Sequence, residues 1–250
     1  MSRPLPTQYG PFRAEQIRPG DPYELSQGHA IQAMGTGGRG ARANLIGGSV
    51  LDSDPDVEEA GVDAGYSPAP DTLRAPDISV GHVPDEPGWI RGVPPLAVEY
   101  ADTGQDDKEL EVKLTELFEA GTRLVWVVRL VGPKRVEIRE PEKPVRVVGP
   151  GEQLEAPGIL RNPVPVEALY DRDAAHEAIL RNLLQRQGYQ DLDAVRAEAL
   201  RTSILSVLEA RAVELDMTTR QRLEDTDELS TLQHCLTRAV AVERADQIFE

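Results

Sequence analysis

Hydrophobic and polar residues follow two different rhythms along this chain, and the rhythm changes near Tyr170. Before that point, short runs of Val, Ile and Leu alternate with polar residues between Gly- and Pro-containing turns, which is typical of strands joined by loops. From Asp171 on, glycine and proline almost vanish and apolar residues recur every three or four positions, which indicates helices. We therefore predict a loosely ordered lead-in over 1–21, a domain over 22–170 and an α-helical appendage over 171–250.

The domain over 22–170 mixes strands and helices. The expected elements, in chain order, are a hairpin turning at Gln27-Gly28, a helix within 37–54, a strand over 77–80, a strand leading into Tyr100, a helix carrying Leu110 to Phe118, and a hairpin formed by 123–130 and 135–140. Helices interspersed among strands are typical of α/β proteins. We expect a mixed β-sheet flanked by helices.

Two charged residues occupy positions where this pattern predicts a core. Glu99 falls inside a strand whose other face is entirely apolar, formed by Leu96, Val98 and Tyr100. Lys113 falls inside the core-facing stripe of the next helix, formed by Leu110, Leu114, Leu117 and Phe118. Because both side chains point toward the interior, we expect the Lys113 ammonium to lie within a few ångström of Glu99.

These residues and Asp77, at the start of an earlier strand, allow two interpretations. Carboxylates on adjacent strands form a hard-oxygen site suited to Mg²⁺ or Mn²⁺, with the carbonyl of Tyr100 as a third ligand. A neighbouring ammonium would orient the attacking water and stabilise charge on a phosphodiester. Alternatively, Glu99 and Lys113 form a buried ion pair, and Asp77 only caps a loop.

Composition limits the remaining possibilities. The chain of 250 residues is 40% hydrophobic, so it can bury a core, and its one cysteine excludes an internal disulfide. No apolar run reaches membrane length, and the amino-terminal residues do not resemble a signal peptide, so we expect a soluble, cytoplasmic protein with no membrane partner. The net charge of −16 argues against nucleic-acid binding over the whole surface but permits a local site.

The ordered segments "RAPDISV", "PPLAVEY" and "KELEVKLTELFEAGTRLVWVV" resemble the Uma2 family of restriction endonuclease-like proteins, within the PD-(D/E)XK nuclease superfamily. The resemblance covers residues 22 to about 170. It implies a metal-dependent endonuclease acting on DNA, in a bacterial defence or mobile-element context, with Asp77 and Glu99 as metal ligands. The superfamily lysine usually lies two residues after the glutamate, where Ala101 stands here, so Lys113 is the matching position.

Some positions depart from the family pattern. Asp102 follows the strand where relatives often have Ser-Pro-Ser, and we interpret it as a turn residue rather than an extra ligand. Gly40 stands where the first helix often carries a histidine. These departures, the acidic charge and the helical appendage favour a second hypothesis, a catalytically weak nuclease-like module for interaction or regulation.

Other signals carry less weight. "GTGGRG" matches G-x-G-x-x-G, but no alternating βαβ units surround it, so we interpret it as a turn. Arg39, Arg42 and Arg74 could face a phosphate backbone, although loop arginines are usually solvated. The appendage has more apolar positions than three short helices could cover, so we expect it to self-associate or to dock a partner: Leu183, Leu184, Ile204, Leu208, Leu232, Leu236, Val240, Ile248 and Phe249.

Overall fold

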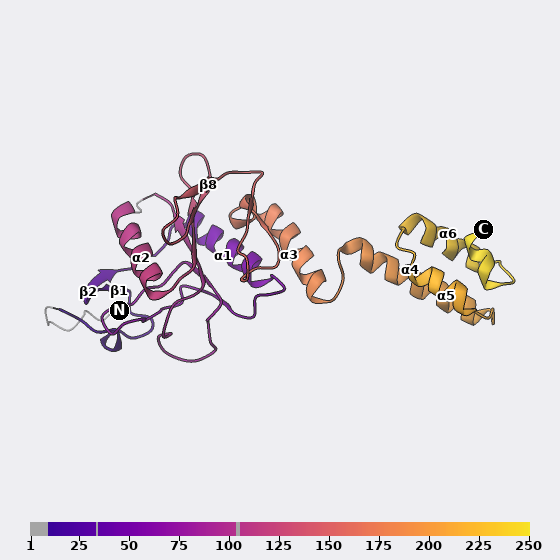
Figure 1. Ribbon diagram of the computed structural model, residues 1–250, viewed down its shortest axis with the longest axis horizontal. Helices are drawn as coiled ribbons and strands as arrows, with labels where there is room; N and C mark the ends of the chain where they lie inside the picture. Colours follow the sequence, from indigo (N-terminus) through magenta and orange to yellow (C-terminus); the bar gives the residue numbers. More distant parts are fainter. Residues whose placement is uncertain (1–9, 34, 104–105) are drawn as a thin grey trace. The chain divides into compact units, whose positions relative to one another are not determined.

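The computed structural model describes residues 10–33, 35–103 and 106–250 of the chain. It divides into two compact units, Met1–Leu183 and Leu184–Glu250, which we describe separately. The first unit contains the β-sheet, and the second contains only helices (Figure 1). Within the described ranges, no helix is both long and apolar enough to cross a bilayer.

A six-stranded mixed sheet forms the centre of the first unit, with strand order β3-β4-β5-β6-β7-β8. Strands β5 and β6 run parallel, and every other neighbouring pair is antiparallel. The fold class is therefore the predicted α/β arrangement. The strands are β3 (Ala60–Val62), β4 (Ile78–Val80), β5 (Leu96–Ala101), β6 (Leu124–Arg129), β7 (Arg135–Arg139) and β8 (Arg146–Val148).

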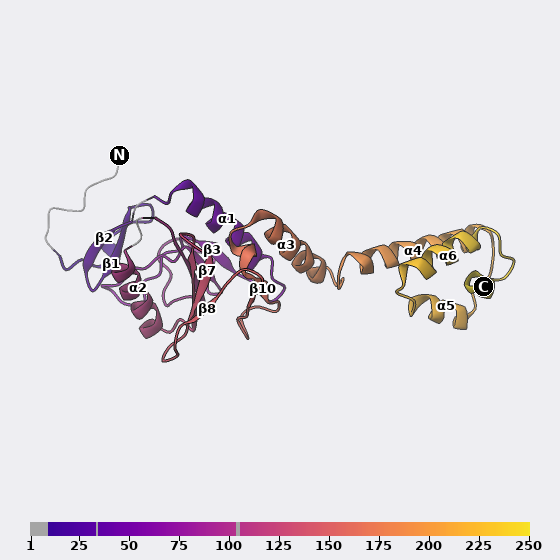
Figure 2. The same ribbon diagram turned by 90° about the horizontal axis from the view of Figure 1, so that it is seen from above.

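Strand β5 is buried along its whole length because helices cover both faces of the sheet. On one face, Leu96, Val98 and Tyr100 join the main core around the fully buried Trp126. This core also receives helix α1 (Gly38–Asp52), which lies on the other side of the sheet from α2 (Figure 2). Gly47 of α1 is required here, since a Cβ at that position would collide with the Tyr100 hydroxyl.

Helix α2 (Asp107–Ala120) covers the opposite face as the crossover between the parallel strands β5 and β6. It begins where the Asp106 carboxylate accepts hydrogen bonds from the backbone N–H groups of Lys108 and Glu109, and it ends at Gly121, whose φ is 115°. The predicted stripe is correct: Leu110, Leu114 and Leu117 are buried against Ala97, Ala101, Val125 and Val127 of the sheet.

A two-stranded hairpin precedes the sheet, with β1 (Tyr23–Ser26) and β2 (His29–Gln32) turning at the predicted Gln27-Gly28. It packs in a small core of its own, to which the preceding residues contribute Ala14 and Ile17. Residues 10–21 are thus partly held in place, through a short 3₁₀ helix (Ala14–Gln16). The prediction of a loose lead-in weighed its Pro and Gly content and gave no weight to these two apolar side chains. Residues 1–9 lie outside the described part.

The first unit extends beyond Tyr170, where the sequence placed its end. After two short strands, β9 (Gln153–Leu154) and β10 (Val164–Pro165), and a 3₁₀ helix (Val166–Leu169), the chain forms α3 (Arg172–Arg186). Ala175 and Ala178 of α3 are buried in the same core as α1. The unit therefore ends at Leu183, and most of α3 belongs to it rather than to the appendage.

The second unit is helical and has its own core. It contains α4 (Leu192–Ala210), α5 (Met217–Glu224), α6 (Leu229–Ala239) and a 3₁₀ helix (Ala245–Phe249). Asp216 caps α5 by accepting a hydrogen bond from the backbone N–H of Thr219, whereas α6 follows Glu228, whose side chain does not cap it. Four of the apolar residues expected to need a partner are already buried within this unit: Ile204, Leu208, Leu232 and Ile248.

Part of the apolar surface that was expected to drive association of the appendage is covered within the second unit. Leu236 and Phe249 pack partly against the internal core of the second unit. Leu183 and Val240 are the members of the predicted set that stay exposed, at 48% and 64%. Self-association therefore stays a prediction, and its basis is narrower than the sequence indicated.

Candidate active site

Strand pairing brings the two predicted carboxylates together. Because Ile78 of β4 pairs with Val98 of β5 in antiparallel register, Asp77 lies next to the stretch that carries Glu99. The Asp77 Oδ2 accepts a hydrogen bond of 2.6 Å from the backbone N–H of Tyr100, which fixes its orientation. Glu99 is 5% exposed and faces the side of the sheet that α2 covers.

Helix α2 supplies the ammonium group at the predicted position. Lys113 Nζ lies 2.8 Å from Glu99 Oε1 and donates a 2.7 Å hydrogen bond to the carbonyl of Ala75. Its side chain is only 13% exposed, so it points to the sheet and not to bulk water. The expected proximity of Lys113 and Glu99 is therefore confirmed. This contact alone fits both the nuclease interpretation and the ion-pair interpretation.

The electrostatics of the site distinguish it from a balanced ion pair. Burial raises the pKa of Glu99 to about 8, even though the nearby Lys113 lowers it, and the charges of Asp77 and Glu24 raise it further. Burial likewise raises the pKa of Asp77 above its usual range. Burial would lower the pKa of Lys113, but the surrounding carboxylates, Glu99 first, raise it overall. The site thus holds more carboxylates than it can neutralise.

Two of these carboxylates were missed by the sequence analysis. Glu24 of β1 places its Oε1 3.4 Å from Lys113 Nζ. Asp63, directly after β3, has a pKa raised by burial and by Glu24 and lowered by Lys113, so it also faces this charge cluster. The hairpin itself was predicted, but its position over the site depends on tertiary packing. For Asp63, the sequence offered only a polar residue in a loop.

These side chains open into a cleft of about 650 Å³. Its lining includes Asp77, Glu99 and Lys113, together with Gly35, Thr36 and Gly37 from the segment before α1. Among its described lining residues, the carboxylates outnumber the cations Arg74 and Lys113: Asp21, Glu24, Asp63, Asp77, Glu99, Asp102 and Glu109. An anionic substrate would meet net negative charge here.

Other predicted residues have defined places. The Tyr100 hydroxyl donates to the carbonyl of Leu169 at 2.8 Å on the far face of the sheet, which leaves only the Tyr100 backbone as a possible ligand. Asp102 is held by Arg39 in an ion pair and accepts from the N–H of Thr103, which favours its interpretation as a turn residue. A side chain at Gly40 would collide with Thr36.

A phosphate-binding arginine would be exposed to solvent, whereas Arg74 is buried. Its side chain is 3% exposed, and it forms ion pairs with Glu24 at 3.1 Å and with Glu116 at 2.5 Å. His82, which follows β4, forms a hydrogen bond through Nε2 with the carbonyl of Arg91 at 2.6 Å. Both residues therefore have structural contacts.

The donor set fits a hard divalent cation. Within the described ranges, no cluster of three or more His, Cys, Asp and Glu side chains is arranged to hold a metal ion. Mg²⁺, however, is commonly held by one or two carboxylates, with water and substrate phosphate completing its shell. Asp77 and Glu99 meet that requirement, and the excess of negative charge around Glu99 would be relieved by a cation.

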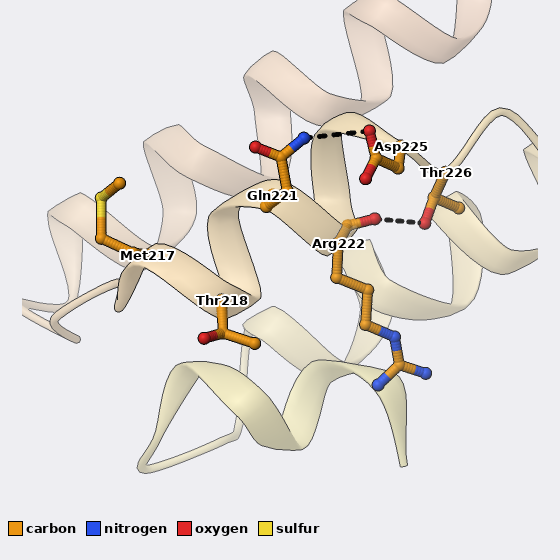
Figure 3. A pocket seen from close by; sticks show the side chains of 6 residues that line it. All are labelled: Met217, Thr218, Gln221, Arg222, Asp225 and Thr226. Carbon is orange, nitrogen blue, oxygen red and sulfur yellow. Dashed lines mark hydrogen bonds between the residues drawn. The ribbon is translucent and has the colours of Figure 1, made fainter.

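A second hollow, of about 710 Å³, lies on α5 in the helical unit (Figure 3). Its polar groups are occupied locally. Gln221 Nε2 donates to Asp225 Oδ1 at 3.0 Å, and Thr226 Oγ1 donates to the carbonyl of Arg222 at 2.6 Å (Figure 3). The described residues that line this hollow do not place a buried carboxylate beside an ammonium. The cleft at β4 and β5 is therefore the better candidate for the active site.

A mixed sheet with carboxylates on neighbouring strands and an ammonium on the crossover helix defines a restriction endonuclease-like fold. Among solved structures, the chain is similar to one described as "a putative nuclease belonging to DUF820 from Anabaena variabilis ATCC 29413". The two share 18% sequence identity with a TM-score of 0.51, over 61% of this chain and 90% of that one, a likeness that shows the fold.

The sequence itself establishes the family. The Uma2 family, described as "Putative restriction endonuclease", matches residues 9–164. The chain therefore belongs to this family, as its motifs predicted. No curated protein matches the chain.

Proposed function

We propose that this protein is a metal-dependent endonuclease that hydrolyses phosphodiester bonds of nucleic acid. DNA is the substrate that we propose. The observation that carries the proposal is the arrangement of two carboxylates, Asp77 and Glu99, on paired strands with the Lys113 ammonium 2.8 Å from Glu99, in surroundings that raise the pKa of both carboxyl groups. A cluster built only for stability would balance its charges. The family and the structural relative, both described as nucleases, support this reading.

Each site residue has a role in this proposal. Asp77 and Glu99 would hold the cation, with the Tyr100 carbonyl as a third ligand. When bound, Mg²⁺ or Mn²⁺ lowers the pKa of a coordinated water and neutralises charge on the phosphate. The hydrogen bond from the Tyr100 N–H keeps Asp77 aimed at the cleft. Lys113 would direct the attacking water and stabilise the charge that develops on the phosphorus oxygens.

The acidic cleft supports the dependence on metal. A nucleic-acid backbone carries regularly spaced negative charges, and proteins usually bind it with clustered Lys and Arg. Here one cation, Arg74, is buried in ion pairs, and the other, Lys113, is at the site itself. A divalent cation would therefore be needed both to admit the substrate and to activate water. The defence or mobile-element setting follows from the family resemblance alone.

The competing function is a catalytically weak nuclease-like module for interaction or regulation. One observation favours it: Lys113 already contacts Glu99, Glu24 and the carbonyl of Ala75, so its ammonium is fully engaged. The absence of a histidine at Gly40 points the same way. A measurement of cleavage separates the two hypotheses.

The test uses supercoiled plasmid incubated with the full chain in Mg²⁺, in Mn²⁺ and in EDTA. We expect nicked or linear product in either metal and none in EDTA. Lys113→Ala and Asp77→Asn should abolish the product. Cleavage that persists in EDTA, or that survives both substitutions, would contradict the proposed site. A single-stranded DNA and an RNA of the same sequence then define the substrate class.

A further inference from the structure

The amino-terminal hairpin contributes a carboxylate that the nuclease mechanism above does not use. Glu24 of β1 is 15% exposed, and its two oxygens bridge two cations. Oε1 lies 3.4 Å from Lys113 Nζ, and Oε2 accepts a 3.1 Å hydrogen bond from Arg74 Nη1. Glu24 therefore links the hairpin to the helix that carries the site lysine.

The Glu24 carboxylate is held in place by Arg74, which is in turn bound by Glu116. Arg74 Nε donates to Glu116 Oε2 at 2.5 Å, and Ser26 of the same strand β1 donates to Glu116 Oε1 at 2.6 Å. Glu116 belongs to α2, one turn after Lys113. The hairpin is thus fastened to α2 at two places, by the charge-assisted hydrogen bond from Ser26 to Glu116 and by the ion pair between Glu24 and Lys113, and Arg74 links the two glutamates.

We propose that Glu24 is a positioning residue of this site, which holds the Lys113 ammonium in place over Glu99 while Arg74 fixes the Glu24 carboxylate. The inference rests on the proposed function, because the position of Lys113 matters for cleavage only if Lys113 acts there. It adds a residue from a separate small core to the set Asp77, Glu99 and Lys113.

The geometry explains why a second carboxylate is needed. An ammonium has three N–H donors, and Lys113 is a flexible side chain on a four-carbon stem. Its neighbours at Nζ are the Ala75 carbonyl, which accepts a hydrogen bond at 2.7 Å, and the carboxylates of Glu99 and Glu24, which form ion pairs at 2.8 Å and 3.4 Å. If Glu99 bound a cation, the Ala75 carbonyl and Glu24 would remain to hold the ammonium. Without Glu24, one fixed contact would be left.

The first experiment observes the ammonium directly and does not depend on activity. The chain has four lysines, Lys108, Lys113, Lys134 and Lys143. All of them except Lys113 are exposed. ¹⁵N-lysine labelling should therefore give one ammonium resonance protected from exchange with water, absent in Lys113→Arg. We expect Glu24→Gln to broaden or remove this resonance.

Glu116→Gln is the matched control, because it makes the same change on the other side of Arg74 and does not touch Lys113. The protected resonance should persist in this variant. Glu24→Asp retains the charge but withdraws it by one methylene, so it should weaken the resonance without removing it. Circular dichroism and thermal unfolding check that each variant folds.

The second experiment measures metal-dependent cleavage. Glu24→Gln should lower kcat by about 10- to 100-fold with KM nearly unchanged, since a small displacement of a catalytic group costs that much. Glu116→Gln should stay within about threefold. If the wild type cleaves, Lys113→Ala does not, and Glu24→Gln changes neither the resonance nor kcat, the inference about Glu24 is overturned and the nuclease stands. If the resonance responds but no nucleic acid is cleaved, the positioning contact stands and the nuclease proposal fails.

Discussion

Two buried glutamates on the same face of the sheet have opposite electrostatic surroundings. Glu99 of β5 pairs in register with Val127 of β6, which in turn pairs with Glu137 of β7, so both glutamates lie in one row under α2. Burial raises the pKa of Glu99 to about 8, in the company of Asp77 and Glu24 and a single lysine. Burial also acts on Glu137, but hydrogen bonds from Arg129 and Arg139 lower its pKa below the usual range.

The difference shows what a structural ion pair looks like in this protein. Glu137 has two arginines within 2.9 Å, and those arginines are shared with Asp107 and Glu111 of α2. Each charge in that cluster has a partner, so burial is compensated. Around Glu99 the carboxylates outnumber the ammonium. The same residue type, in the same row, thus has its charge balanced at one end and lies among an excess of carboxylates at the other.

The largest expected effect is on catalysis. Glu99→Gln should reduce Mg²⁺-dependent cleavage by about 100- to 1,000-fold, because it removes a metal ligand and the partner of Lys113. Glu137→Gln, a matched change two strands away, should leave the rate within about threefold. Rates measured under single-turnover conditions decide the matter. An equal loss in both variants would mean that Glu99 acts only through folding.

The second effect concerns stability, in EDTA, as a function of pH. The folded pKa of Glu99 lies above its unfolded value, so the folded chain binds the extra proton between about pH 4.5 and 8 and loses stability as pH rises through that window. Glu99→Gln should flatten this decline by about 1–3 kcal/mol. The folded pKa of Glu137 is lowered, so its contribution is present at neutral pH and is lost in acid.

Denaturant unfolding at pH 5, 6.5 and 8 tests both signs. At pH 7, Glu137→Gln should destabilise the protein by about 1–3 kcal/mol, since it leaves two arginines without their shared partner. Glu99→Gln should be neutral or stabilising at pH 8. A wild-type curve that rises between pH 5 and 8, unchanged by Glu99→Gln, would show that the Glu99 carboxyl is already ionised in the metal-free protein.

A third effect is the response to metal. Mg²⁺ or Mn²⁺ should stabilise the folded chain by up to about 2.7 kcal/mol at one hundred times its dissociation constant. The response should be larger at pH 8 than at pH 6, because Glu99 must be ionised to bind a cation. Asp77→Asn and Glu99→Gln should erase it, and Glu137→Gln should retain it. A thermal shift that survives the first two substitutions would place the ion elsewhere.

The smallest effect concerns the helical unit. Cutting the chain after Tyr170 would remove Ala175 and Ala178 from the first core, so the truncation belongs after Gly188, beyond α3. We expect the shortened chain to cleave within about threefold of the full rate and to be monomeric by light scattering, while the full chain self-associates through its exposed apolar residues. If both are monomeric at micromolar concentration, self-association is wrong and a partner protein is left as the role of the appendage.

The sequence predicted the part of the site that follows from local periodicity. The alternation of side chains along β5 predicted the sheet face on which Glu99 lies, and the apolar stripe of α2 predicted that Lys113 points toward the sheet. Their contact could therefore be inferred from the sequence alone. Asp77 followed from the same logic. The fold class was also accessible, because strand and helix rhythms are local properties of the chain, and the family followed from the resemblance of three ordered segments.

The parts that depend on long-range packing could not be predicted. Glu24 reaches Lys113 only because the hairpin β1–β2 packs beside α2, and Asp63 only because β3 pairs at the edge next to β4. The amount of uncovered apolar surface on the appendage was overestimated for a related reason, because the sequence does not show that α4 and α6 pack in one core. The periodicity of a sequence predicts which face of a helix or strand is buried, but it does not predict which other element packs against that face.

The pairing of β5 with β6 also has a consequence for the order in which the site is assembled during synthesis on the ribosome. Glu24, Asp77, Glu99 and Lys113 all precede Leu124–Arg129 in the chain, so every charged group of the site emerges before the strand that walls it in. Because β6 is the neighbour of β5 in the sheet, the burial of Glu99 can be completed only after β6 has been synthesised. The desolvation of this carboxyl group is therefore a late event in the synthesis of the first unit.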